Sequence, residues 1–123
     1  MKLPGTYVDG FLIPVPKDKI DDYRELAQSA SVIWREHGAL QYTECVADDL
    51  TTDFCRSFLS AAGAKDGETV IFAWAVFADR EARDEANARI MADPRIQELG
   101  ARSDAIFDCK RMAFGGFAPL VAD

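Results

Sequence analysis

The chain has few of the residues from which metal sites and disulfides are built. Its 123 residues include one histidine and three cysteines, Cys45, Cys55 and Cys109, with no C-x-x-C pair. Structural zinc needs four clustered Cys or His ligands, so the sequence predicts no metal site. Three reduced thiols are the simplest interpretation. Cys109, beside Lys110 and Arg111, is the alternative candidate for a reactive thiol.

Long hydrophobic runs and clusters of basic residues are also absent. No apolar stretch approaches the ~20 residues of a membrane helix, and the first residues, MKLPGTYVDG, lack the pattern of a cleaved signal peptide. Fourteen Lys and Arg against 21 Asp and Glu give a net charge of −7. This balance disfavours DNA or RNA as a partner, because nucleic-acid binding depends on neutralised phosphates. We therefore expect one cytoplasmic domain spanning residues 1–123, with neither a membrane nor a nucleic acid as partner.

What the sequence does have is two strands that are apolar on both faces. Residues 68–79 read ETVIFAWAVFAD, and Tyr7–Pro16 reads YVDGFLIPVP. A strand of an antiparallel sheet with one wet face should alternate apolar and polar residues, and these segments do not. Two helices can cover one face of a four-stranded sheet, so the second face needs a partner. A second copy of the chain is the most economical one.

Periodicity and capping residues predict the elements. The expected strands are residues 7–16, 39–47, 68–78 and 110–121, and the expected helices are 17–37 and 79–92, followed by a short helix over 94–100. Asp18 and Asp79 are expected to cap the two longer helices, and Gly38 to end the first. In segment 51–67, Asp53 could cap a short helix that presents Phe54 and Phe58.

The resulting order, β-α-β-β-α-β, is the ferredoxin-like arrangement of an α+β fold with a four-stranded antiparallel sheet. Its strand order, 4-1-3-2, places residues 7–16 and 68–78 at the centre, in agreement with their apolar character on both faces. Two such sheets packed face to face make a dimeric α+β barrel.

Four separated motifs carry a resemblance to a known family. They are YVDGFLIPVPKDK, WREHGALQYTECVADD, ARIMADPRI and KRMAFGGF, and together they span about residues 7–117. In this order and spacing they resemble the DUF1428 family of bacterial proteins of unknown function. The resemblance implies a dimeric α+β barrel similar to the antibiotic-biosynthesis monooxygenases, and it implies no particular activity.

Two residues are candidates for proton transfer. His37, the single histidine, lies at the end of the buried stripe of the first helix, where it could act as a general base or simply stabilise the helix dipole. Asp9 lies in mid-strand on an otherwise apolar face, so a charged partner is expected, and Arg111 on the neighbouring strand is the candidate. Asp9 could be a perturbed acid in a pocket or half of an interface ion pair.

The remaining candidates form the walls of a pocket between sheet and helices. Aromatic side chains could hold a planar ligand there, or could be core packing alone. Glu44, on the same face as Tyr42, is a second acid that could enter this space, and Asn87 could hydrogen-bond a ligand or the nearby chain. The full set of expected ligand-contacting residues is Tyr23, Trp34, Tyr42, Glu44, Trp74, Asn87 and Arg111.

Two hypotheses for function follow. The first is a homodimer that binds a small hydrophobic or aromatic metabolite, in its sharper form a cofactor-independent, monooxygenase-like enzyme in which Arg111 holds an anionic group. The second is a dimer with a filled core that acts through a protein partner. No cofactor is expected, because Gly115-Gly116 is too short for a phosphate loop and no helix follows it; a bulge or a close backbone approach is expected there instead.

Overall fold

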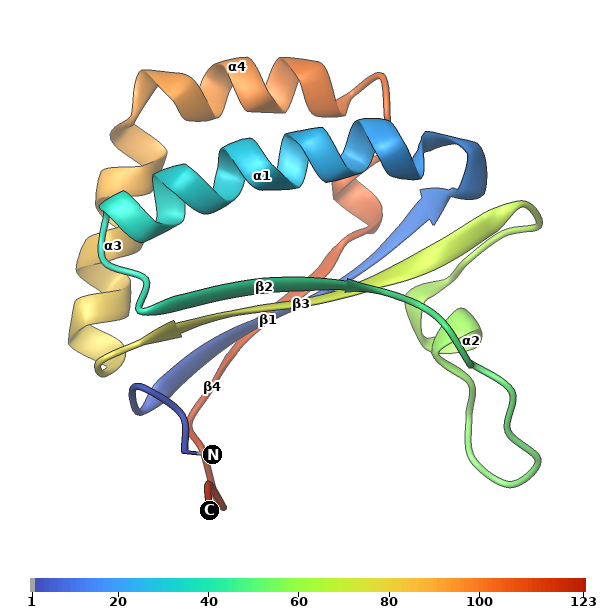
Figure 1. Cartoon of the computed structure of the whole chain (residues 1–123), viewed down its shortest axis with the longest axis horizontal. Helices are drawn as coiled ribbons and strands as arrows, with labels where there is room; N and C mark the ends of the chain where they lie inside the picture. Colours follow the sequence, from blue (N-terminus) through green and yellow to red (C-terminus); the bar gives the residue numbers. More distant parts are fainter. Residues whose placement is uncertain (1) are drawn as a thin grey trace.

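The computed structural model describes residues 2–123 as a single twisted sheet with the longer helices packed on one side (Figure 1). The strands pair in the order β2-β3-β1-β4, and all pairs are antiparallel. This confirms the predicted ferredoxin-like topology and the central position of β1 and β3. The elements in chain order are β1 (Tyr7–Pro16), a 3₁₀ turn (Lys17–Lys19), α1 (Ile20–Glu36), β2 (Gln41–Val46), α2 (Phe58–Ala62), β3 (Glu68–Phe77), α3 (Arg80–Ala92), α4 (Pro94–Ser103), a second 3₁₀ turn (Cys109–Arg111) and β4 (Ala113–Phe117).

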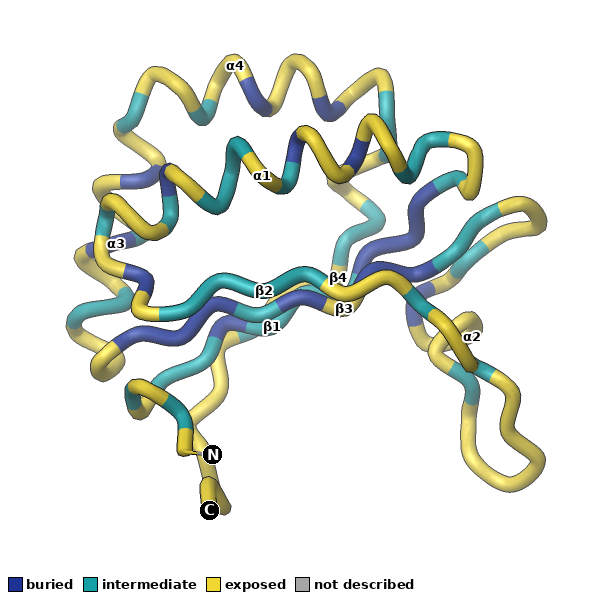
Figure 2. Tube along the Cα trace, in the orientation of Figure 1, coloured by how far each residue is buried: buried dark blue, intermediate teal, exposed yellow. Residues whose placement is uncertain are grey.

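The helical layer consists of α1, α3 and α4, which all lie over the same face of the sheet (Figure 1). The register pairs Ile13 with Ile71 and Phe11 with Ala73, so odd-numbered positions of both central strands share this face. Buried Leu26 and Ile33 of α1 pack with Ile90 of α3 in the core. Of the described residues, the opposite face carries α2 with its flanking loops and the segments before β1 and after β4, and Figure 2 shows these segments as mostly exposed.

Local chemistry explains where the longer helices begin and end. The Asp79 side chain accepts a hydrogen bond from the Ala82 amide, which confirms it as the cap of α3. Asp93 caps α4 by accepting from the Arg95 amide, and Pro94 occupies the first helical position. Gly38 follows α1 with a φ of +124°, a conformation that a side chain would strain, so the predicted stop is confirmed.

Four of the local predictions are wrong. Asp18 does not cap α1, which is preceded by the 3₁₀ turn and has no side-chain cap. The cap of α2 is Ser57 rather than Asp53, and Phe54 lies outside the helix, 94% exposed. The β4 strand is shorter than expected, because Asp108 caps a 3₁₀ turn that holds Arg111 out of the sheet. Helix α4 continues past Gly100 to Ser103.

Among the described residues, no helix combines the length and the apolar character needed to cross a membrane.

Candidate functional site

A cavity of about 430 Å³ lies between the helix-covered face of the sheet and the helical layer. Small side chains leave this space open: Ala73 lies on the sheet side, and Ala27 and Ala30 lie on α1. Its volume falls within the range of small-molecule sites. Six of the residues predicted from the sequence line it, namely Asp9, Tyr23, Trp34, Tyr42, Glu44 and Asn87.

A carboxylate held by two phenols forms one polar element of this cavity. The Tyr42 hydroxyl donates to Glu44 Oε2 at 2.6 Å, and the Tyr23 hydroxyl, from α1, donates to Glu44 Oε1. Tyr42 and Glu44 are two residues apart in β2 and therefore share a face, as the sequence predicts. Burial, reinforced by the neighbouring Glu44 charge, raises the pKa of both Tyr23 and Tyr42. Both phenols therefore stay protonated and remain donors to the carboxylate.

Asp9 forms a second polar element, and its partner is not the one expected. Its side chain is 1% exposed and accepts from Arg83 Nε at 2.9 and 3.1 Å. Burial raises the pKa of Asp9, while hydrogen bonding to Arg83 and to Asn87 opposes the rise. The predicted pair with Arg111 is wrong, because α3 brings Arg83 across the sheet. The sequence indicates this pair only weakly. Arg83 lies three residues before the inward-facing Ala86 and therefore lies next to the buried stripe of α3.

The space for Arg83 depends on Gly116 of β4, which is paired with Asp9 in the sheet. A Cβ atom at Gly116 would overlap the Arg83 guanidinium and lie 2.5 Å from the Tyr7 hydroxyl. The Arg83 guanidinium also stacks over the Tyr7 ring, 5.0 Å from its centroid. The sequence predicts a close approach at Gly115-Gly116, and in the structure the side chains of Arg83 and Tyr7 approach Gly116 closely. The strand pairing continues through both glycines without a bulge.

Arg111 lies outside the cavity. Its guanidinium donates to both Glu68 oxygens at 2.7 and 2.8 Å and to the Gly63 carbonyl at 2.7 Å. The hydrogen bonds from Arg111 lower the pKa of Glu68 to about 2. The role given to Arg111, holding an anionic group of a ligand in this cavity, is therefore wrong.

Trp74 lies on the other face of the sheet from Tyr42, so the expectation that it shares a pocket with Trp34 and Tyr42 is wrong. Its indole Nε1 donates to Gln41 Oε1 at 2.8 Å, and its ring meets Phe72 edge-on. Because β3 is apolar on both faces, the sequence did not distinguish the face covered by helices from the open one.

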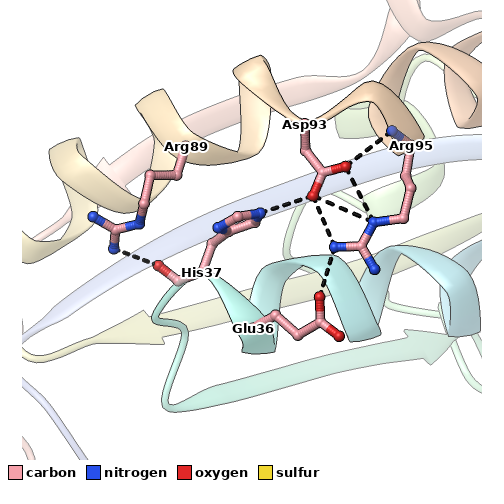
Figure 3. Close-up of polar contacts among 5 residues, drawn as sticks. All are labelled: Glu36, His37, Arg89, Asp93 and Arg95. Carbon is pink, nitrogen blue, oxygen red and sulfur yellow. Dashed lines mark hydrogen bonds and ion pairs between the residues drawn. The ribbon is translucent and has the colours of Figure 1, made fainter.

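His37 also lies outside the cavity, in an ion network that joins α1 to the start of α4 (Figure 3). Its Nε2 lies 2.8 Å from Asp93 Oδ2, and Arg89 donates to its carbonyl at 2.6 Å. Arg95 donates to Asp93 at 2.7 Å and to Glu36 at 2.6 Å. The contacts from Arg95 and His37 hold the pKa of Asp93 well below its usual range. This placement favours a structural role for His37, at the end of α1, over a role as a general base.

Sequence reasoning missed the contribution of the segment after α4. The Phe107 ring meets Tyr23 edge-on at 5.5 Å, and both line the cavity. Cys109 also lines it, and its sulfur lies 3.4 Å from Ser103 Oγ. Within residues 2–123, no group of three or more His, Cys, Asp or Glu side chains is arranged to hold a metal ion.

The open face of the sheet is hollowed into an apolar groove of about 720 Å³. Large side chains remain exposed there: Phe72 is 44% exposed and Phe117 62%. The Phe58 ring of α2 stacks on Phe72 with centroids 5.8 Å apart. The two faces of one sheet thus differ in kind, one enclosing a partly polar cavity and the other presenting exposed rings.

Comparisons with known proteins agree with this fold. "Uncharacterized protein YbaA" of Escherichia coli K12 is 43% identical over 115 residues, covering 94% of this chain and 97% of that protein. An uncharacterized NIPSNAP domain protein from Burkholderia xenovorans superposes with a TM-score of 0.58 at 14% identity, covering 94% of this chain and 95% of its own. SnoaB, a cofactor-independent oxygenase from Streptomyces nogalater, superposes with a TM-score of 0.56 at 16% identity, covering 94% and 93%.

At these identities the two structural likenesses establish the shared α+β fold and nothing further. The family model described as "Protein of unknown function (DUF1428)" matches residues 6–109, and together with the extent of the likeness to YbaA this shows that the chain belongs to the DUF1428 family.

Proposed function

We propose that the protein binds a small, largely apolar aromatic molecule in the cavity between sheet and helices. The observation that carries this proposal is the cavity itself, about 430 Å³ and lined by aromatic side chains with a few polar groups among them. Such a lining is typical of small-molecule sites, in which apolar walls supply affinity and a few polar groups fix orientation. The alternative of a dimer with a filled core expects no cavity of this size, and the cavity weighs against it.

The enzymatic form of the proposal assigns proton handling to Glu44 and Asp9, the two carboxyl groups that line the cavity. Glu44 is the better placed of the two to receive a proton from a ligand, because it is held by phenols alone, whereas Arg83 occupies both oxygens of Asp9. SnoaB, which shares the fold, works without a cofactor, and a cofactor-independent reaction is the form we propose here.

We further propose that two copies of the chain pair through the open face of the sheet. Exposed rings on a hollowed apolar surface favour a protein partner over water. A second copy is the natural occupant, because pairing about a two-fold axis would cover the same apolar strands in both chains.

Ligand binding can be tested with 2-naphthylmethanol, a neutral planar probe, by ¹H–¹⁵N NMR. The chain has two tryptophans, and Trp34 lines the cavity while Trp74 lies on the open face. Their indole N–H signals therefore report separately on the two faces. We expect the Trp34 signal to shift on titration while the Trp74 signal stays in place.

A cavity-filling variant supplies the control. Ala30→Leu adds three carbons inside the cavity, and Ala88→Leu adds them at an exposed position of α3. Ala30→Leu should weaken binding at least tenfold, whereas Ala88→Leu should leave it unchanged. A probe that shifts only Trp74, or that binds Ala30→Leu as well as the unmodified chain, would contradict the proposed site.

A further inference from the structure

Glu44 is an acid without a basic partner among the described residues. Its two oxygens accept hydrogen bonds from the Tyr23 and Tyr42 phenols, and none of the ion pairs found among residues 2–123 includes it. A carboxylate has about four acceptor sites, so two neutral donors leave it able to accept more. Asp9, the other carboxyl group of the cavity, is by contrast neutralised by Arg83.

Aromatic rings surround the space next to Glu44. The Trp34 and Tyr42 rings lie 5.8 Å apart at an angle of 57°, and Phe107 meets Tyr23 from the side. All four rings line the same cavity as the carboxylate. Aromatic faces attract cations, and the attraction increases where water is excluded. A carboxylate among aromatic rings is the combination that recognises an ammonium group attached to an apolar body.

No basic side chain from residues 2–123 lines this cavity. Arg83 borders it but is bound to Asp9. Arg24 lines a separate, smaller groove that shares the Tyr23, Tyr42 and Glu44 side chains. Its guanidinium is bound to Asp21 at 2.7 Å. An anionic ligand would therefore enter an apolar space beside the Glu44 carboxylate and would find no free cation there, which is costly.

We infer that the ligand is an arylalkyl amine, bound with its ammonium group at Glu44 and its ring system among Trp34, Tyr42 and Phe107. This inference rests on the proposed ligand-binding function and names the chemical class that the cavity selects. The ammonium donates a charge-assisted hydrogen bond to Glu44, whose orientation is fixed by Tyr23 and Tyr42. Asp9 and Asn87 line the same cavity and supply its other polar groups.

Three probes with one ring system test the charge preference: 2-naphthylmethylamine, 2-naphthylmethanol and 2-naphthoic acid. At pH 7 they are cationic, neutral and anionic, and the Trp34 indole signal reports the binding of each. We expect the amine to bind at least tenfold more tightly than the alcohol, and the acid to bind more weakly than either.

Two variants assign the preference to one carboxylate. Glu44→Gln should weaken amine binding at least tenfold and change alcohol binding less than threefold. Glu25→Gln removes one carboxylate from the exposed side of α1 and should change neither. If Glu44→Gln does not fold, the relative affinities of the three probes for the unmodified protein still test the charge preference.

The outcomes separate the inference from the function on which it rests. If the alcohol binds at Trp34 but the amine binds no more tightly, or if the acid binds as well as the amine, the amine inference is overturned and the binding function stands. An amine affinity that Glu44→Gln leaves intact also overturns it. If none of the three probes moves the Trp34 signal, both the inference and the proposed function fail.

Discussion

The two faces of this sheet are both apolar in sequence, but they differ in structure. The helix-covered face encloses a cavity, and the open face presents exposed rings. On β3 the helix-covered face carries Ala73 and Ala75, whereas the open face carries Phe72 and Trp74. Small side chains under helices leave a cavity, which Glu44 supplies with a polar group. Large rings without a covering layer leave a surface that only another apolar surface would bury. In the middle of β3 the size of the side chains distinguishes the two faces, and their hydrophobicity does not.

The largest expected effect concerns the polar groups beneath the helices. Arg83→Leu would leave Asp9 buried without its partner, and we expect it to lower the free energy of unfolding by about 3–5 kcal/mol. Chemical denaturation followed by circular dichroism measures this. Arg80→Leu removes an arginine three residues away whose ion pair is exposed, and it should cost less than about 1 kcal/mol. If the two variants lost the same free energy of unfolding, the larger cost assigned to the buried Asp9–Arg83 pair would be contradicted.

The next effect tests the open face. Phe72→Lys places a charge among the exposed rings, and we expect the dissociation constant of the proposed dimer to rise at least 100-fold. None of the described residues that line this groove is an acid that could pair with a buried lysine. Sedimentation velocity over a range of concentrations measures the dissociation constant. Val32→Lys, at a 51% exposed position of α1, serves as the matched control and should associate normally.

A smaller effect depends on pH. Glu68 has a pKa of about 2 in the fold against a usual value of 4.5, so its pair with Arg111 stabilises the protein above pH 4.5 and this contribution is lost as the pH falls towards 2. Glu68→Gln should therefore cost about 1 kcal/mol at pH 7 and almost nothing near pH 2. Denaturation of both chains at several pH values measures the difference. A cost that does not change with pH would contradict the assignment.

The smallest effect concerns a residue that belongs to neither face. His37→Gln removes the contact with Asp93, and we expect a loss of about 1 kcal/mol or less in the free energy of unfolding. The affinity for 2-naphthylmethanol should stay within a factor of two, because His37 does not line the cavity. A tenfold loss of affinity in a folded variant would restore the ligand-binding interpretation of this histidine.

Much of the fold follows from local signals in the sequence. The apolar runs of β1 and β3 predict their central position, while Asp79, Gly38 and Pro94 mark helix boundaries through their own backbone and capping chemistry. The caps at Ser57 and Asp108 were missed. Several residues near them could cap a turn equally well, and the choice depends on how the surrounding loop packs.

Part of the candidate site also follows from periodicity. Tyr42 and Glu44 share a face because strands alternate, and Tyr23 and Trp34 share the buried stripe of α1 because of the helical repeat. The pairs of Asp9 with Arg83 and of Glu68 with Arg111 could not be predicted in this way. They depend on where α3 crosses the sheet and on where the chain turns before β4, and neither position is encoded by periodicity.

Native mass spectrometry of the unmodified protein with 2-naphthylmethylamine tests most directly whether one face binds ligand while the other binds a second chain. We expect a mass of twice the 13.6 kDa chain carrying up to two amines, because each chain keeps its own cavity when the open faces pair. A single chain of 13.6 kDa at micromolar concentration, or a dimer that takes up no second amine at saturating amine, would contradict this division between the two faces.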